Sequence, residues 1–281
     1  MRIEQEQNSR SQDGIEPVGL RAEKLAAGYG RQLIIDDITL SVPDATMTVL
    51  VGPNGSGKST LLSVMARLLK PMGGSVMLDG KALHAMPTRE VARRLGLLPQ
   101  SPLLPEGLTV YDLVSRGRYP HQGLIRQWTD ADEAAVEHAL TVTDTLEFAN
   151  RPVADLSGGQ RQRCWIAMAL AQETPIILLD EPTTFLDLHY QVEVLELLRR
   201  LARHHGRTII AVLHDLNFAL QYADRLVFLK SGAVAGVAEH PSQCTIELVR
   251  DVFNVEVLRL ENPESDTPFF LPSTKGRRPE R

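Results

Sequence analysis

The stretch that decides the fold is GPNGSGKST, which in residue numbers is Gly52, Pro53, Asn54, Gly55, Ser56, Gly57, Lys58, Ser59 and Thr60. It fits the pattern G-x-x-x-x-G-K-[ST], in which a glycine-rich turn holds phosphate groups. Residues 46–51 (TMTVLV) have the apolar run of a short buried strand, and residues 61–69 have the apolar spacing of a helix. Strand, glycine turn and helix follow in the order that a phosphate-binding loop requires.

Each part of this loop has a chemical reason. Glycine lets the backbone turn so that several N–H groups point inward, where they bind phosphate oxygens at the positive end of the following helix. Lys58 would then reach the outer phosphates, and the Ser59 hydroxyl would bind Mg²⁺. A plain turn between a strand and a helix would require neither side chain. We therefore expect all nine loop residues to form a nucleotide site.

The composition is that of a globular protein. Of the 281 residues, 43% are hydrophobic and 23% charged, and the net charge of −5 argues weakly against nucleic acid as a partner. No stretch approaches the ~18 consecutive apolar residues of a membrane span. Residues 1–17 are polar, lack the apolar middle of a signal peptide and are expected to form a flexible cytoplasmic lead-in. Cys164 and Cys244 are expected to be small buried thiols.

A second motif lies at residues 175–181, which read PIILLDE. An apolar run that ends in two acids is typical of a strand buried on both faces of a parallel sheet, with its carboxyl end opening into a site. Asp180 is placed to hold Mg²⁺, directly or through water, and Glu181 to accept a proton from an attacking water. A helix cap or a solvated turn would also explain two acids, but less well beside a phosphate-binding loop.

A third motif, here called the signature segment, is Leu156-Ser157-Gly158-Gly159-Gln160. Residues 161–172 have a helical pattern, so Ser157 can cap this helix while the glycines allow close approach of the backbone. The segment is therefore a candidate second anion site at a helix N-terminus. A simple serine cap would explain Ser157 but would leave the glycines and Gln160 without a purpose.

Together these motifs resemble one family, the ATP-binding subunits of ABC transporters, and the resemblance covers nearly the whole chain from about residue 20. In that family the signature segment occurs between the two other motifs, as it does here. The resemblance implies that Tyr29 stacks on adenine, that Gln100 links the magnesium site to a membrane partner, and that His214 contacts the γ-phosphate. It also places Leu186 and Asp187 at the seam of a dimer. Taken singly, Tyr29, Gln100 and His214 could equally be ordinary turn or strand-end residues.

The resemblance further implies ATP and Mg²⁺ as cofactors, with Ser59, Gln100 and Asp180 at the metal, and Glu181, Gln100 and His214 in catalysis. Two copies would pair head to tail, each site combining one copy's phosphate loop with Ser157 to Gln160 and Asp187 of the other. Such an ATPase lies on the cytoplasmic side of the cell membrane as a peripheral subunit. It drives transmembrane permease subunits and serves a substrate-binding protein indirectly. The alternatives are a soluble ABC-type ATPase that acts on nucleic acid, ribosomes or cofactor assembly, and a nucleotide-dependent regulatory or scaffold module that hydrolyses poorly.

Three stretches extend the resemblance to a subgroup that serves iron(III)-siderophore importers, close to haem and vitamin B12 importers. They are residues 117–123 (GRYPHQG), 181–187 (EPTTFLD) and 213–217 (LHDLN). Phe185 departs from the Trp or small residue that is frequent there. Because ATPase subunits of this family are not expected to touch the cargo, these likenesses describe no cargo site.

The fold class predicted is α/β, a P-loop NTPase of the ABC type with a mixed, mostly parallel core sheet, an antiparallel β edge and an inserted helical subdomain. Parallel core strands are expected at residues 46–51, 95–98, 176–179 and 208–213, and antiparallel strands at 20–27, 34–42 and 75–79. The ATP-binding domain is expected at residues 18–275, with the helical subdomain at about 101–155 and a mobile tail at 276–281.

Within and beyond that subdomain two helices stand out. Residues 130–143 have helical spacing behind a Thr129 cap, and residues 189–205 form an amphipathic helix expected to pack on the sheet. Residues 268–272 could add a short strand, and His204 and His205 are expected on the surface. Gln100 and residues 101–118 could form the groove for a membrane partner's helix. The apolar residues Leu108, Val110 and Leu113 would then face either that partner or the interior.

Overall fold

The computed structural model describes residues 19–100, 107–123, 127–263 and 265–273. Its strands are β1 (Leu20–Tyr29), β2 (Gln32–Ser41), β3 (Met47–Val51), β4 (Gly73–Leu78), β5 (Lys81–Ala82), β6 (Leu95–Leu98), β7 (Ile176–Asp180), β8 (Thr208–Val212), β9 (Arg225–Lys230), β10 (Ala233–Ala238), β11 (Val257–Glu261) and β12 (Pro268–Pro272). The α-helices are α1 (Lys58–Met65), α2 (Thr88–Ala92), α3 (Val110–Ser115), α4 (Asp130–Val142), α5 (Gly158–Ala171), α6 (Leu188–His205), α7 (Leu216–Tyr222) and α8 (Ile246–Phe253).

The core sheet has the strand order β10-β9-β3-β8-β7-β6, in which all neighbours run parallel except β10 and β9. Successive residues of a strand point to opposite faces, so β3 sends Met47 and Val49 to one hydrophobic core and Leu50 to the other. The first core is shared with α3 to α7, and the second with α1 and the antiparallel sheet. The mixed sheet predicted from the sequence is confirmed.

The antiparallel strands form a separate four-stranded sheet of order β2-β1-β4-β5 instead of an edge of the core sheet. The antiparallel edge of the core sheet is made by β10. The elements β9, β10, β11, α7 and α8 were not predicted from the sequence. The strand at residues 268–272 is confirmed as β12. The Asn217 side chain holds it beside α7, since Asn217 donates to the Phe270 carbonyl (3.1 Å) and accepts from the Phe270 N–H (2.8 Å).

Several element ends differ from the expectation. The first helix runs Lys58–Met65, not residues 61–69, because it starts directly at the phosphate loop and Arg67 has a left-handed φ of 61° that ends it. The helix expected at 161–172 begins at Gly158. Thr129 caps α4 as predicted, in a reciprocal capping box with Asp132. His204 is exposed as expected, whereas His205 is half-buried against His138, with 6.0 Å between ring centroids.

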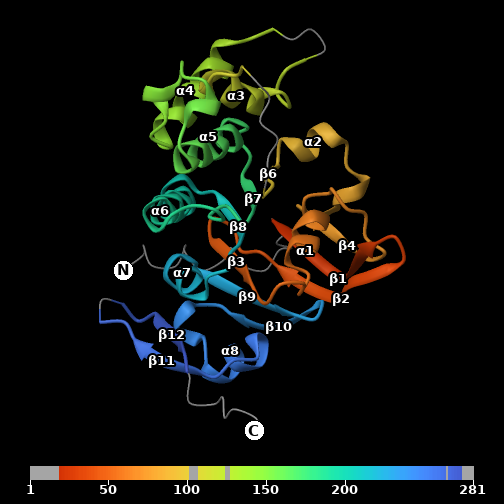
Figure 1. Cartoon of the computed structure of the whole chain (residues 1–281). Helices are drawn as coiled ribbons and strands as arrows, with labels where there is room; N and C mark the ends of the chain where they lie inside the picture. The colour runs from red at the N-terminus through yellow and green to blue at the C-terminus, as the bar shows by residue number, and fades with distance from the viewer. Residues whose placement is uncertain (1–18, 101–106, 124–126, 264, 274–281) are drawn as a thin grey trace, which may run out of the picture.

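Helices α3, α4 and α5 pack on one another at one end of the molecule, while α8, β11 and β12 lie at the opposite end (Figure 1). We call α3 to α5 the three-helix unit. Val110 and Leu113 of α3 are fully buried in it, which decides between the two expectations in favour of interior packing. Leu108 is half-buried, and residues 101–106 of the expected groove lie outside the described residues. Among the described residues no helix is both long and apolar enough to cross a bilayer.

Candidate active site

The phosphate-binding loop joins β3 to α1 and opens into a cavity of about 450 Å³. Gly57 is the N-cap residue of α1 with a φ of 100°, and a Cβ there would lie only 2.5 Å from Ile35 Cγ2. Gly55 has a φ of 77° and open space where a Cβ would stand, on the cavity side. The cavity is lined by Ile34, Asn54, Gly55, Gly57, Lys58, Ser59, Thr60, Gln100, Glu181 and His214. The loop thus has the positive φ angles, accessible to glycine, that let the backbone curve around a phosphate group.

Lys58 is the cation of this loop. Its Nζ donates to the carbonyl oxygens of Gly52 and Pro53, each at 2.9 Å, which folds the side chain back over its own loop. Burial lowers the pKa of Lys58, while the carboxylates of Glu181 and Asp180 act in the opposite direction. Gly52, Pro53 and Ser56 support the loop without lining the cavity.

The Ser59 hydroxyl donates to Asp180 Oδ1 at 3.0 Å, which joins the start of α1 to the end of β7. Burial raises the pKa of Asp180, and the Ser59 hydrogen bond opposes that effect. A hydroxyl and a carboxylate are oxygen donors of the kind that Mg²⁺ uses together with substrate phosphates. The two residues therefore fit the metal role expected of them. Gln100 lies close by but bonds to Glu181.

Glu181 is the centre of the polar cluster. Its carboxylate accepts a hydrogen bond from Gln100 Nε2, pairs with His214 Nε2 at 2.6 Å and accepts from Thr184 Oγ1 at 3.1 Å. Gln100, Glu181 and His214 follow β6, β7 and β8, three neighbouring parallel strands whose carboxyl ends meet at one edge of the sheet. Glu181 also has a left-handed φ of 53°, uncommon for a residue with a side chain. The structure thus brings together three residues that the sequence analysis named for catalysis. It adds Thr184, which the sequence analysis quoted only as part of residues 181–187.

The signature segment is built as a helix cap. Ser157 Oγ accepts from the Gln160 N–H at 3.3 Å, and Gln160 Oε1 accepts from the Ser157 N–H at 3.1 Å. Gln160 therefore serves as the partner of Ser157 in a capping box, a role that the sequence analysis did not predict. A Cβ on Gly159 would lie 2.2 Å from the Tyr190 ring, so this position admits no side chain. None of these residues lines the cavity of the phosphate loop.

Two further expected residues also lie outside that cavity. Tyr29 ends β1 and is 56% exposed, a free aromatic face beside the turn to β2. Asp187 is exposed and caps α6, accepting from the Tyr190 N–H at 3.1 Å. Both are exposed and therefore available to a ligand or a second copy.

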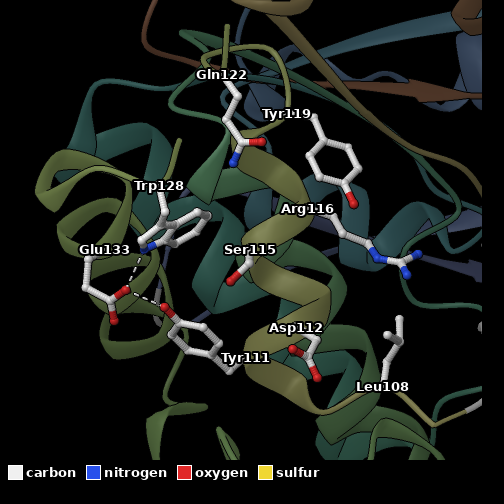
Figure 2. A pocket seen from close by; sticks show the side chains of 9 residues that line it. All are labelled: Leu108, Tyr111, Asp112, Ser115, Arg116, Tyr119, Gln122, Trp128 and Glu133. Carbon is white, nitrogen blue, oxygen red and sulfur yellow. Dashed lines mark hydrogen bonds between the residues drawn. The ribbon is translucent and has the colours of Figure 1, made fainter. Parts of the chain in front are cut away.

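A second hollow, of about 560 Å³, lies in the three-helix unit (Figure 2). Two aromatic side chains point to one acid there, since Tyr111 Oη and Trp128 Nε1 both donate to Glu133 Oε2, the latter at 2.8 Å. These hydrogen bonds lower the pKa of Glu133, while burial and the same bond raise the pKa of Tyr111 to about 12. The lining is completed by Leu108, Asp112, Ser115, Arg116, Tyr119 and Gln122. It is a mixed polar and aromatic surface, and the carboxylates of both its acids, Asp112 and Glu133, are already hydrogen-bonded.

Comparison with known proteins identifies relatives over most of the chain. The model of the family described as ABC transporter matches residues 35–184. The probable siderophore transport system ATP-binding protein YusV of Bacillus subtilis (strain 168) is 50% identical over 258 residues, covering 92% of this chain and 94% of that protein. The petrobactin import ATP-binding protein FpuD of Bacillus anthracis is 49% identical over 259 residues, covering 92% and 95%.

Solved structures agree with the sequence matches. A transporter assigned to the metal-chelate ABC type, in an inward-facing conformation, superimposes with a TM-score of 0.79 at 28% identity, covering 92% of this chain and 98% of that chain. The dimeric post-hydrolysis state of the ATP-binding cassette MJ0796, bound to ADP and Pi, gives a TM-score of 0.66 at 30% identity, covering 78% and 97%.

Proposed function

This chain belongs to the ATP-binding subunits of ABC transporters, which hydrolyse ATP, and we propose that it uses this hydrolysis to energise the import of iron(III)-siderophore complexes. The observation that carries the enzymatic part is the cluster of Gln100, Glu181 and His214 at the mouth of the phosphate-loop cavity. The cargo is supported by relatives of about half identity whose names state siderophore or petrobactin transport.

In this proposal the loop N–H groups and Lys58 hold the β- and γ-phosphates, so Lys58 exchanges its two carbonyl partners for phosphate oxygens. Ser59 and Asp180 would hold Mg²⁺, which would neutralise the negative charge that develops on the phosphates. Glu181 accepts the proton of the attacking water, because it is the carboxylate that faces the cavity. Gln100 and His214 hold Glu181 in place through their contacts with its carboxylate, and both line the cavity in which the γ-phosphate would lie.

The proposed active form is a head-to-tail homodimer. Gly158 of the signature segment and Asp187 are exposed, Ser157 is half-buried, and all three lie outside the cavity of their own chain, so the sites they are expected to complete belong to a second copy. The proposed location is peripheral, on the cytoplasmic face of the cell membrane, where permease subunits couple the dimer to a substrate-binding protein.

The hollow of Figure 2 is the proposed contact for a permease helix, in place of the apolar face of Val110 and Leu113, which is buried. Tyr119 is 52% exposed at its rim. Tyr119→Ala should therefore uncouple transport from hydrolysis in reconstituted vesicles and leave the ATPase rate of the isolated subunit nearly intact. Crosslinks that place the permease on another face of this subunit would overturn the assignment.

The cargo is tested by growth and uptake in a strain that lacks this chain. We expect poor growth when iron is supplied only as a siderophore complex, recovery with abundant free iron, and no rescue by Lys58→Ala because closure on ATP requires that cation. Accumulation of radiolabelled ferric siderophore is the direct measurement. Normal siderophore uptake together with lost uptake of haem or cobalamin would reject the siderophore cargo and leave the ATPase assignment standing.

A further inference from the structure

Residues 117–123 take no part in the phosphate-loop site, yet they make several contacts with the neighbouring helices. Gly117 packs so tightly on the last turn of α5 that a Cβ there would lie 2.2 Å from the Met168 carbonyl oxygen. The adjacent Arg118 is 4% exposed. Its guanidinium donates to Asp132 at 2.9 Å, to the Ala171 carbonyl at 2.7 Å and to Glu173 at 2.6 Å. One side chain thus joins α4 to the end of α5.

The end of α5 has a second partner in the same segment. His121 Nε2 lies 2.8 Å from the Gln172 carbonyl, so Arg118 and His121 together pair with two carbonyls that the helix end leaves open. The Gln172 side chain in turn donates to the Ala92 carbonyl, at the end of α2, at 2.6 Å. The last residues of α5 are therefore tied both to this segment and to α2.

Helix α2 holds the segment from the other side. Arg89 donates through Nε to the Pro120 carbonyl at 2.9 Å, and through Nη2 to the His121 carbonyl at 3.2 Å and to the Gln122 carbonyl. Arg93 adds a bond from Nε to the Pro120 carbonyl at 3.0 Å. A guanidinium that collects several carbonyls at fixed angles orients a loop in a way that a lysine ammonium does not.

These contacts connect the helix that begins at the signature segment with the helix that leads to Gln100. Helix α5 begins at the signature segment, and α2 leads through Arg94 into β6, after which Gln100 stands. The C-terminal end of α5 is thus fixed relative to the core sheet by Arg118, His121 and Arg89. Because α5 is a continuous helix of 14 residues, the position of its C-terminal end and its direction determine where its N-terminus lies. We call Arg89 together with Arg118, Pro120, His121 and Gln122 the clamp.

We propose that the clamp is a positioning device that fixes the angle at which α5 presents Ser157 and Gly159 to the ATP of a second copy, with Arg89 as its key residue. This inference rests on the proposed head-to-tail dimer. Loosening the clamp should leave nucleotide binding at the phosphate loop unchanged, because Arg89 lies outside the lining of that cavity. It should weaken closure of the dimer, because more orientations of α5 become accessible.

The test uses the full chain in a Glu181→Gln background, which is expected to bind ATP without hydrolysing it. Arg89→Ala, Arg89→Lys and the control Lys81→Ala are compared by sedimentation at saturating Mg-ATP and by nucleotide titration of the monomer. Lys81 is a matched control because it pairs with Glu90 of α2 at 3.6 Å without contacting the clamp. We expect Arg89→Ala to weaken dimerisation about tenfold at constant nucleotide affinity, Arg89→Lys to weaken it less, and Lys81→Ala to have no effect.

A distance measurement separates the inference from the proposed function. Spin labels at Glu137 of α4 and Val237 of β10, both exposed, report the angle between the three-helix unit and the core sheet in the nucleotide-free monomer. Burial raises the pKa of Cys164 and Cys244 to about 12, so these thiols compete poorly for the label. Arg89→Ala should broaden the distance distribution, and Arg89→Lys decides the matter if the alanine variant does not fold.

The outcomes are distinct. An unchanged distance distribution together with parental dimerisation in Arg89→Ala would overturn the clamp. A fall in nucleotide affinity as large as the fall in dimerisation would also overturn it, because the effect would then arise at the phosphate loop. Failure of the clamp-intact Glu181→Gln chain to dimerise would reject the proposed sandwich, while the distance distribution would still decide the clamp.

Discussion

The carboxyl edge of the core sheet and the three-helix unit solve different problems with charged groups. At the sheet edge, Glu181 lines a cavity, and both Glu181 and Asp180 bond to side chains that can exchange partners. In the three-helix unit, Arg118 and Asp132 are both 4% exposed and are bound to each other and to the backbone. The first arrangement suits a site that binds and releases a substrate, and the second suits a rigid unit that moves as one piece.

A change at the sheet edge should remove chemistry and leave structure. Glu181→Gln is expected to lower the steady-state ATPase rate by about 10²- to 10⁴-fold, because a neutral amide cannot take the proton of the attacking water. ATP binding should persist, since the phosphates are held by the loop and Lys58. Phosphate release at saturating Mg-ATP measures the rate, and a titration with labelled nucleotide measures binding. An ATPase rate equal to that of the parent would show that Glu181 is not the base.

A change in the three-helix unit should lower the stability of the fold and leave nucleotide binding intact. Arg118→Ala leaves Asp132 buried without its partner, and breaking a buried pair in this way costs about 3–5 kcal/mol. Urea unfolding should show this loss, while nucleotide affinity at the phosphate loop should change little in the folded fraction.

Arg151→Ala is the matched control for Arg118→Ala, because Arg151 is exposed and lies 5.6 Å from the Phe148 ring centre. Its loss should cost about 1 kcal/mol at most. If both variants lose the same stability, Arg118 is not the anchor that its contacts indicate.

The contrast also explains what the sequence could predict. The phosphate loop, Asp180 and Glu181 were found because each is a short motif at the end of an apolar strand, where one local pattern specifies both fold and chemistry. Gln100 and His214 were predicted through the resemblance to the family. Because β6, β7 and β8 are neighbouring parallel strands, Gln100, Glu181 and His214 lie at one edge of the sheet. Local patterning was enough there.

Contacts between distant segments had no such signal. Arg89 and Gln122 are 33 positions apart, and Arg118 and Glu173 are 55 apart, so neither pair leaves a periodic or spaced trace in the sequence. Strands β9 and β10 were missed for a related reason. They are joined by a tight turn at Ser231 and Gly232, and their places are decided by strand pairing, of β9 with β3 and of β10 with β9, rather than by local alternation. Leu108, Val110 and Leu113 were left open because periodicity cannot distinguish an inner from an outer apolar face.

The smallest expected effect is a difference in pH dependence between the two regions. Burial alone would raise the pKa of Asp132, but hydrogen bonds from Arg118 and Thr129 outweigh it, so the pKa is lowered in the folded protein. A carboxyl with a depressed folded pKa contributes stability that is fully present above its unfolded pKa of about 3.9 and is lost as the pH falls through the folded value. Asp180 has the opposite sign, because burial raises its pKa and ionisation in the folded state is disfavoured.

Thermal unfolding of Asp132→Asn and Asp180→Asn against the parent between pH 7 and pH 3 tests this opposition. The stability deficit of Asp132→Asn should shrink as the pH falls below about 4, by no more than about 1.4 kcal/mol per pH unit for one proton. Asp180→Asn should be more stable than the parent at pH 7, because it removes a partly buried charge, and should lose that advantage as the parent's Asp180 becomes protonated on acidification. A common pH dependence for both variants would mean that the two carboxyls do not differ in the way their surroundings indicate, and would remove the electrostatic part of the contrast between sheet edge and three-helix unit.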